Sequence, residues 1–471
     1  MVMGTDAGDE FHSGAGRHLP HTVIHRIASG VAWGDVGPMV RGCSPPRESG
    51  AMKLKLVLAT ASAMGVLMSA AWANDSNTLY LEQIGEGNLA DVHQSSGGGN
   101  NDIGTAGDPI TQAGNHNSFS FSNSGSGSGT NNDVIDVEQL GNNNIFSSAA
   151  WNGANNNVID DVEQIGNANR VSVSMNGSDA GLVDDVLQQG NGNHLVIEQS
   201  GSNSSGNKVL SVSMIGDNNG LPPDANGDWR RAGTYLFQSG NSNVVAKSSI
   251  TGSNNIGPAG DSNTYRNTHR IEQRGTGNTA SAVTLGSLGL DPSTDYNRIW
   301  IFQTGDGNTS DVSQGLSAAS FGNKAQVTQT GNDNTGNGLQ SGDANTIAIS
   351  EIGSHNSVTV NQTGDGNSAT ANITGNSNGG GVMSGGAWSV AASNGLTSGL
   401  IVQDGFSNTA LYTVSGSDSN QFAFLQDGNL NSITGSVSGS GGNQAAVAQT
   451  GSSNTVSFTQ IGSSNNLAVS Q

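Results

Sequence analysis

The segment NSVTVNQTGDGN, residues 356–367, holds the pattern on which the fold depends. Every second residue, among them Val358, Val360 and Gln362, falls on one face of an extended chain, and the residues between them are Ser, Thr and Asn. Alternation over seven residues with β-branched members predicts a short β-strand buried on one side. Residues 364–367, Gly-Asp-Gly-Asn, then favour a tight reversal. The segment is therefore predicted to be one strand and one turn.

This unit recurs every 11 residues around the quoted segment. Its first position is occupied in turn by Gln329, Gln340, Glu351, Gln362 and Ile373, with glycine two residues later and asparagine five residues later each time. The string Gln-x-Gly-x-x-Asn occurs 15 times in the chain. A repeat of this kind predicts an all-β, amyloid-like β-solenoid, in which two units form one strand–turn–strand layer of about 22 residues.

Stacked layers bring equivalent residues of successive repeats together. Paired strands lie about 4.8 Å apart, so glutamine stacks on glutamine and asparagine on asparagine, and their side-chain amides can bond along the stack. We therefore predict a structural ladder, represented by Gln83, Gly85, Asn88, Gln329, Gly331, Asn334, Gln340, Gly342, Asn345, Gln362, Gly364, Asn367, Gln449, Gly451, Asn454, Gln460, Gly462 and Asn465.

The composition agrees with a polar interior. Hydrophobic residues make up 33% of the 471 residues and charged residues 11%, against about 45–50% and 25% in ordinary globular domains. Glycine contributes 70 residues. Amide ladders and a thin apolar strip are thus expected to replace a conventional core.

Residues 52–73 have the features of a secretory signal peptide. Lys53 and Lys55 precede an apolar stretch that is too short to span a bilayer, and Ala71-Trp72-Ala73 provides a cleavage site. We expect translation to start at Met52, which makes residues 1–51 a misassigned upstream segment. The exported solenoid is then predicted to comprise residues 74–471.

The repeat, as in Gln449-Thr450-Gly451-Ser452-Ser453-Asn454, resembles the curlin repeat of bacterial curli fibre subunits, and the resemblance covers about residues 79–471. It implies a secreted functional amyloid that crosses the outer membrane through a dedicated pore and polymerises on the cell surface as a pilus-like fibre. The partners that it implies are the chain itself, other curli-type subunits and the secretion pore. The chain departs from the family in carrying more repeats and in having no evident targeting segment before Gln83.

Insertions interrupt the period at about residues 221–235, 256–270 and 286–298, and their prolines predict loops. Eight of the ten Lys and Arg after residue 73 lie between Lys208 and Arg298, including Arg270 and Arg274. This basic belt is expected either to contact an acidic matrix polymer or a neighbouring subunit, or to neutralise local acids.

Other classes of function fit less well. The formal net charge of −21 disfavours nucleic-acid binding. A calcium β-roll needs nonapeptides with regularly spaced Asp, whereas the period here is 11, so no metal or cofactor is expected. The histidines after the signal, His93, His116, His194, His269 and His355, have no second ligand at metal spacing and are expected to be exposed turn or loop residues.

No catalytic arrangement is evident, so the chain is not expected to be an enzyme. The expected role is that of a structural fibre subunit for adhesion and biofilm matrix, and not of an integral membrane protein. The alternative is a monomeric or surface-tethered β-solenoid adhesin that binds a ligand through loops 221–298.

Overall fold

The computed structural model describes residues 53–59, 66–67, 77–95, 101–103, 109–124, 132–149, 157–176, 181–200, 207–217, 234–241, 243–251, 268–285, 297–315 and 322–471. Two compact units divide the chain, Met1–Glu48 and Ser49–Gln471. The first unit lies outside the described residues, and so does the predicted upstream segment 1–51.

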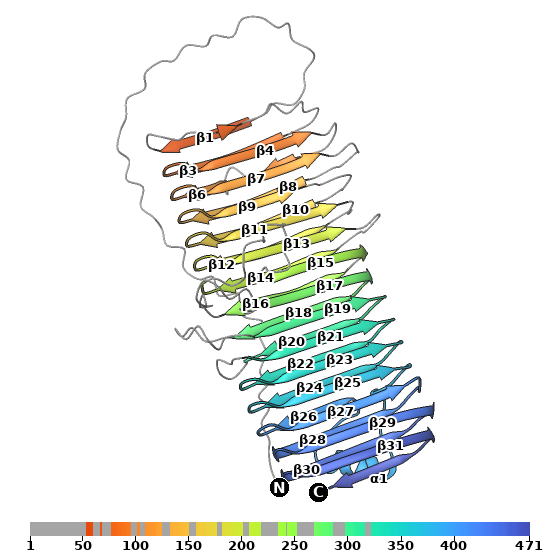
Figure 1. Ribbon diagram of the computed structural model, residues 1–471. Coiled ribbons are helices and arrows are strands. Elements are labelled where there is room, and N and C mark those ends of the chain that lie inside the picture. The colour runs from red at the N-terminus through yellow and green to blue at the C-terminus, as the bar shows by residue number, and fades with distance from the viewer. Residues whose placement is uncertain are drawn as a thin grey trace, which may run out of the picture. The chain divides into compact units, whose positions relative to one another are not determined.

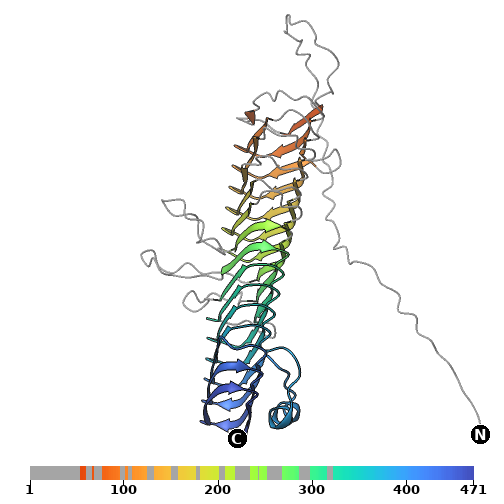
Figure 2. The same cartoon turned by 90° about the vertical axis from the view of Figure 1, so that its right-hand side faces the viewer.

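Ser49–Gln471 is a parallel β-solenoid, as predicted (Figure 1). The chain passes alternately between two sheets, here named sheet A with 17 strands and sheet B with 15 strands. Most strands therefore pair with the strand two positions further along the chain, and every pairing among them is parallel. Figure 2 shows the two sheets facing each other along the stack.

Sheet A contains β1 (Lys53–Ala59), β3 (Asn77–Ile84), β5 (Asn101–Ile103), β6 (Ile110–Ala113), β8 (Asn132–Leu140), β10 (Asn157–Ile165), β12 (Leu182–Gln189), β14 (Lys208–Ile215), β16 (Val244–Thr251), β18 (Thr279–Leu285), β20 (Thr309–Gln314), β22 (Thr335–Ser341), β24 (Ser357–Thr363), β26 (Leu400–Asp404), β28 (Gln421–Asn429), β30 (Gln444–Ser452) and β32 (Asn466–Ser470). Sheet B contains β2 (Val66–Leu67), β4 (Leu89–Ser95), β7 (Ser118–Ser124), β9 (Ile145–Ala149), β11 (Arg170–Asn176), β13 (His194–Ser200), β15 (Thr234–Asn241), β17 (Thr268–Thr276), β19 (Arg298–Thr304), β21 (Lys324–Thr330), β23 (Thr346–Ile352), β25 (Ser368–Thr374), β27 (Thr409–Ser415), β29 (Ser432–Gly441) and β31 (Thr455–Ser463).

The alternation of side chains decides what is buried. In β24, Val358, Val360 and Gln362 are at most 1% exposed, while Thr359 and Asn361 between them are half-buried. The interior is therefore one narrow apolar column that runs between the two sheets. Larger rings fill it in places, as where Phe119 stacks on Phe146 with ring centroids 5.3 Å apart.

The strands refine the predicted segments. β1 and β2 lie within the predicted signal peptide 52–73 and pair with β3 and β4, and cleavage after Ala73 stays a prediction. β15, β17 and β19 begin at Thr234, Thr268 and Arg298, inside the predicted loops 221–235, 256–270 and 286–298. The last residues of these three loops are thus strand, because they already follow the alternating pattern; most of the remaining loop residues lie outside the described ranges.

One helix, α1 (Gly385–Ser393), occurs in the described part of the chain, and it was not predicted. It belongs to an insertion between β25 and β26 and lies beside β30 and β32 at the C-terminal end of the stack (Figure 2). Its buried residues Ala387 and Ala391 form a small apolar cluster with Ala423 and Ala446 of sheet A. Asn466 of β32 also accepts a hydrogen bond from the Ala387 N–H at 2.9 Å.

Candidate self-assembly surface: the amide ladders and the open rung

Glutamine ladders run inside the solenoid. Each side-chain Nε2 donates to the Oε1 of the glutamine on the next rung, as from Gln83 to Gln112 at 2.6 Å and from Gln340 to Gln362 at 3.0 Å. The same Nε2 also donates across the interior, as from Gln340 to the backbone oxygen of Lys324 on sheet B. An amide such as that of Gln340 therefore binds its own sheet and the opposite sheet together. The Oε1 of Gln199, which begins a run, is buried without a hydrogen-bond partner among the described residues.

The glutamine ladder changes sheets along the chain. It lies first in sheet A, then in sheet B, and then in sheet A again, through the three runs Gln83–112–139–164–188, Gln199–238–273–303–329 and Gln314–340–362–403–426–449–471. Where sheet A lacks glutamine, the residues in register with the ladder are Met214, Ile250 and Thr284. Every layer from β3 onward thus keeps a glutamine in at least one sheet across these runs.

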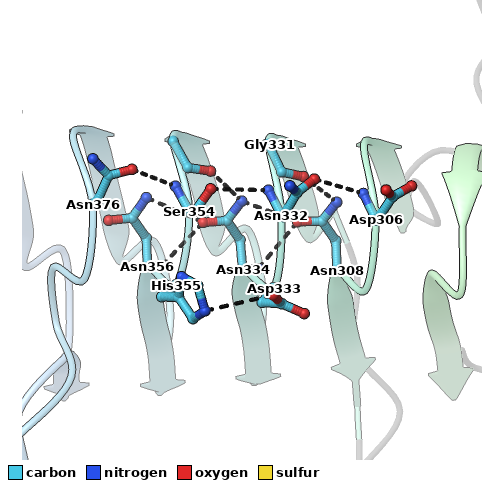
Figure 3. A network of polar contacts seen from close by, with 11 residues as sticks. Asp306, Asn308, Gly331, Asn332, Asp333, Asn334, Ser354, His355, Asn356 and Asn376 are labelled. Atoms are coloured by element: carbon cyan, nitrogen blue, oxygen red, sulfur yellow. Dashed lines mark hydrogen bonds and ion pairs between the residues drawn. The ribbon is translucent and has the colours of Figure 1, made fainter.

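Asparagine ladders occupy the turns. Along one edge, the backbone N–H of each asparagine donates to the Oδ1 of the asparagine before it, at 3.0–3.1 Å, through the series Asn207–243–278–308–334–356–378–420–443–465. Most of these asparagines also donate from Nδ2 to the glycine oxygen of the next turn, as from Asn334 to Gly353 at 2.8 Å. Figure 3 shows Asn308, Asn334 and Asn356 in this arrangement.

A second, outer ladder covers the same turns. Ser354 N–H donates to Asn376 Oδ1 at 2.9 Å, and Asp306 N–H donates to Asn332 Oδ1 at 3.0 Å (Figure 3). His355 and Asp333 form an exposed pair at 3.5 Å, which contributes little because water screens it. In these turns hydrogen bonding therefore continues from the strand into the turn.

The repeat glycines are fixed by close packing. Gly364 has a φ of +93°, and a Cβ built on it would collide with the carbonyl oxygen of Gly405 on the next rung. The second left-handed residue of the turn is often not glycine, and it directly precedes the asparagine, as Asp333, Ala344 and His355 do. Two residues of each such turn therefore have a positive φ: the repeat glycine, which close packing requires, and the residue before the asparagine, whose identity varies.

Most of the predicted ladder residues contact the equivalent residue on a neighbouring rung. Gln329 donates to Glu351 at 2.8 Å, Gln362 to Gln403 at 2.7 Å and Gln449 to Gln471 at 3.2 Å. Gln460 is outside the glutamine ladder, because its neighbour in register is Val437, and it donates instead to the backbone oxygen of Gln444.

Glu351 is a carboxyl group inside an amide ladder, a role that its repeat position could have indicated. It is fully buried, accepts from Gln329 and stacks on Ile373 on its other side. Burial raises the pKa of Glu351 to about 8, and the hydrogen bond from Gln329 opposes the rise. At neutral pH the carboxyl group is therefore mainly protonated and resembles glutamine.

His269 overturns the expectation that the histidines are exposed. It is 1% exposed in β17, where its ring nitrogens contact Ser248 Oγ and Thr284 Oγ1, each at 2.9 Å. Burial lowers its pKa to about 3, so the ring is neutral. His116 and His355, in contrast, are exposed turn residues as expected. The expectation is also wrong for His93 and His194, which lie in strands β4 and β13, and His194 is half-buried. His269 faces inward because it occupies the same column as Thr234 and Ile299.

The rung formed by β31 and β32 is open on its outer side. Leu467 and Val469 are only half-buried, although they stand in the sheet A columns that bury Val358 and Val360 completely. Phe458 is also half-buried, in the sheet B column that buries Tyr412 and Ile349. The outer side of this rung thus exposes apolar side chains of the solenoid interior together with the unpaired edges of β31 and β32.

No family model matches the chain, and no curated protein matches it. Within the described ranges no three His, Cys, Asp or Glu side chains gather as a metal site. Among the described helices there is none long and apolar enough to cross a bilayer.

Proposed function

We propose that this chain is the structural subunit of extracellular curli-like amyloid fibres, exported from the cell and self-assembling on its surface for adhesion and biofilm matrix. Its main partner is a second copy of itself, with other curli-type subunits in the same fibre and an outer-membrane pore for export. The likeness of the repeat to curlin and the predicted signal peptide support export and the cell-surface location.

The direction of the ladders is the observation that carries the proposal. Every glutamine bond named above runs from Nε2 on one rung to Oε1 on the rung that follows it in the chain. A stack of this kind presents amide donors at one end and acceptors at the other. A second copy can therefore add head to tail, and such heterologous contacts produce open filaments instead of closed rings.

The open rung adds a hydrophobic contribution. Leu467 and Val469 on β32 and Phe458 on β31 lose water when another rung covers them. Burial of apolar surface contributes roughly 25 cal/mol per Å². Strand pairing and this burial together favour growth of a continuous cross-β stack.

The test is assembly of purified Asn74–Gln471 without helper proteins. We expect thioflavin-positive fibres whose diffraction shows the strand spacing of about 4.8 Å along the fibre axis. A preformed fibre should also shorten the lag phase of fresh protein. A folded chain that stays monomeric at high concentration would contradict the proposal and favour the adhesin that binds through loops 221–298.

A further inference from the structure

The outer face of sheet B carries an unusual set of side chains on β15, β17 and β19, which lie in successive rungs at the middle of the stack (Figure 1). In register, Tyr235, Arg270 and Trp300 form one outward column. Phe237, Glu272 and Phe302 form the column beside it. Arg274, Arg298 and Lys324 flank these columns, and we call the nine residues together the aromatic–arginine face.

The side chains of this face form a connected layer. The Arg298 guanidinium carbon lies 4.0 Å from the Trp300 ring centroid, and that of Arg270 lies 5.2 Å from the Phe302 centroid. Arg274 stands over Phe237 at 5.2 Å. Guanidinium groups and aromatic rings attract each other in this geometry. The cations are therefore held in place before any ligand arrives.

Glu272 forms ion pairs within this layer but leaves part of the cationic side chains exposed. Glu272 pairs with Arg270 and with Arg274, and the latter contact is 3.6 Å. The Arg274 side chain nevertheless remains 60% exposed, and Lys324 is exposed as well. Neutralising local acid thus accounts for part of the basic belt. On the described strands β13 to β21 the acids of this face are Glu272 and Glu198, the partner of Tyr235, and they lie beside Arg270, Arg274, Arg298 and Lys324.

The concentration of these residue types is confined to this face. On the described strands whose exposure is known, the outward aromatic residues are Tyr80, Tyr235, Phe237, Trp300 and Phe302, and four of the five lie here. Three of the four described arginines whose side chains are placed lie here too. The other outward positions are mostly Ser, Thr, Asn and acids, in a chain whose net charge is −21.

This combination fits a polymer of acidic sugars. A hexuronic acid offers a carboxylate to guanidinium groups, ring C–H surfaces to aromatic side chains and hydroxyl donors to carboxylates such as Glu272. A nucleic acid fits less well, because its denser phosphate charge meets both glutamates and the acidic remainder of the chain. Successive sugar rings of a polymer that runs along the stack would contact these two columns on the rungs of β15, β17 and β19.

We propose that the aromatic–arginine face binds an acidic polysaccharide. It lies on the side of the solenoid, away from the open rung of β31 and β32, so the inference does not depend on polymerisation. Arg230, Arg231 and Arg266 of the predicted basic belt lie outside the described residues.

The experiment measures the affinity of the full chain for polygalacturonate, for its methyl-esterified form and for single-stranded DNA. We expect tighter binding to polygalacturonate than to the neutral ester, with an affinity that falls as salt is added. Trp300→Thr and Arg298→Gln should each weaken binding on the order of tenfold, which is about 1.4 kcal/mol. Threonine and glutamine already occupy outward strand positions at Thr328 and Gln326, so both variants should fold.

Two matched controls lie on the same sheet. Leu411→Thr removes an exposed apolar side chain from the outer face of β27, and Arg170→Gln removes an arginine from the column of Arg298 on β11. Both should leave affinity unchanged. Equal binding of the charged polymer and its ester, no binding, or unaltered affinity of the Trp300 and Arg298 variants overturns the inference. So does tighter binding of DNA through the same residues.

The same samples separate this inference from the proposed function. Fibres that form normally without binding polygalacturonate overturn only the polysaccharide site. Binding by a chain that never forms fibres overturns only the fibre proposal.

Discussion

At the scale of single residues, Glu351 makes the stability of the ladder depend on pH. Its pKa is about 8 in the folded chain against 4.5 for an ordinary glutamate, so between these values the folded state holds a proton that the unfolded state has released. The stabilisation is complete below pH 4.5 and is lost as the pH rises through 8. Glu351→Gln should therefore raise the free energy of unfolding by on the order of 3 kcal/mol at pH 9 and little at pH 4.

Urea denaturation at several pH values measures this difference. Asp404→Asn is the matched control, because it removes a carboxylate that is exposed on β26 outside the ladder. An Glu351→Gln variant whose stability tracks the parent chain from pH 4 to pH 9 would show that Glu351 does not retain its proton.

The left-handed turn positions give a second prediction. Leu430 has a φ of +57° and is 59% exposed, so its conformation carries strain without much compensating burial. Leu430→Gly should stabilise the chain by about 1 kcal/mol. Gly428→Ala in the same turn should destabilise it by on the order of 3 kcal/mol, because the added Cβ collides with the Gly451 carbonyl. Thermal unfolding of both variants tests the sign, and a destabilised Leu430→Gly would refute the strain.

Single residues also show where the sequence was sufficient. The 11-residue period placed Val358, Val360 and Gln362 inside correctly, because alternation and burial coincide in a strand. It did not place His269, because the insertions around β17 hide the register of that strand. The hydrogen bonds with Ser248 and Thr284 offset the cost of burying the polar ring nitrogens of this histidine.

At the scale of elements, the layer of two strands and two turns is the unit that can be removed. Deletion of residues 335–356 takes away β22 and β23 and joins Asn334 to Ser357 in the phase of the repeat. The shortened chain should fold, since each layer contacts mainly its neighbours. Deletion of residues 335–355 removes one residue fewer and turns every following side chain to the wrong face at the junction.

Circular dichroism and urea unfolding compare the two deletions. The 22-residue deletion should keep strand content and lower the unfolding midpoint slightly, whereas the 21-residue deletion should lose cooperativity. Similar behaviour of the two chains would mean that the phase of the repeat does not control the stack.

Elements also mark the limit of the sequence pattern. Helix α1 escaped prediction because its segment is rich in Gly, Ser and Ala, although Met383, Ala387 and Ala391 are spaced by four as on one helical face. The change of the glutamine ladder from sheet A to sheet B escaped it as well. Which sheet a strand joins depends on how each long insertion returns to the stack, and the period alone does not contain that information.

At the scale of the whole molecule, growth should depend on backbone donors at the open rung. Gln471 N–H donates to Ala448 at 2.9 Å and its carbonyl accepts from Thr450, so Gln471 bonds toward β30. Alternate residues of a parallel strand bond in opposite directions, and the Ser470 N–H therefore faces away from β30. Ser470→Pro removes this donor while leaving the pairing of β30 with β32 in place.

We expect Ser470→Pro to keep the unfolding midpoint of the monomer and to slow fibre elongation at least roughly tenfold, as for the loss of about 1.4 kcal/mol at the growing end. Seeded thioflavin kinetics measure elongation, and Ser470→Thr, which keeps the N–H, is the control. Unchanged elongation by the proline variant would show that copies do not add through β32.

Helix α1 has a consequence for how such a polymer would look. Strands recur at every rung, but each molecule contributes a single α1 on the outside of sheet A, next to β30 and β32. With 15 strands in sheet B, that landmark would return after roughly 70 Å. The helix would thus give the filament an axial repeat of one subunit, and individual subunits could be counted along it in electron micrographs.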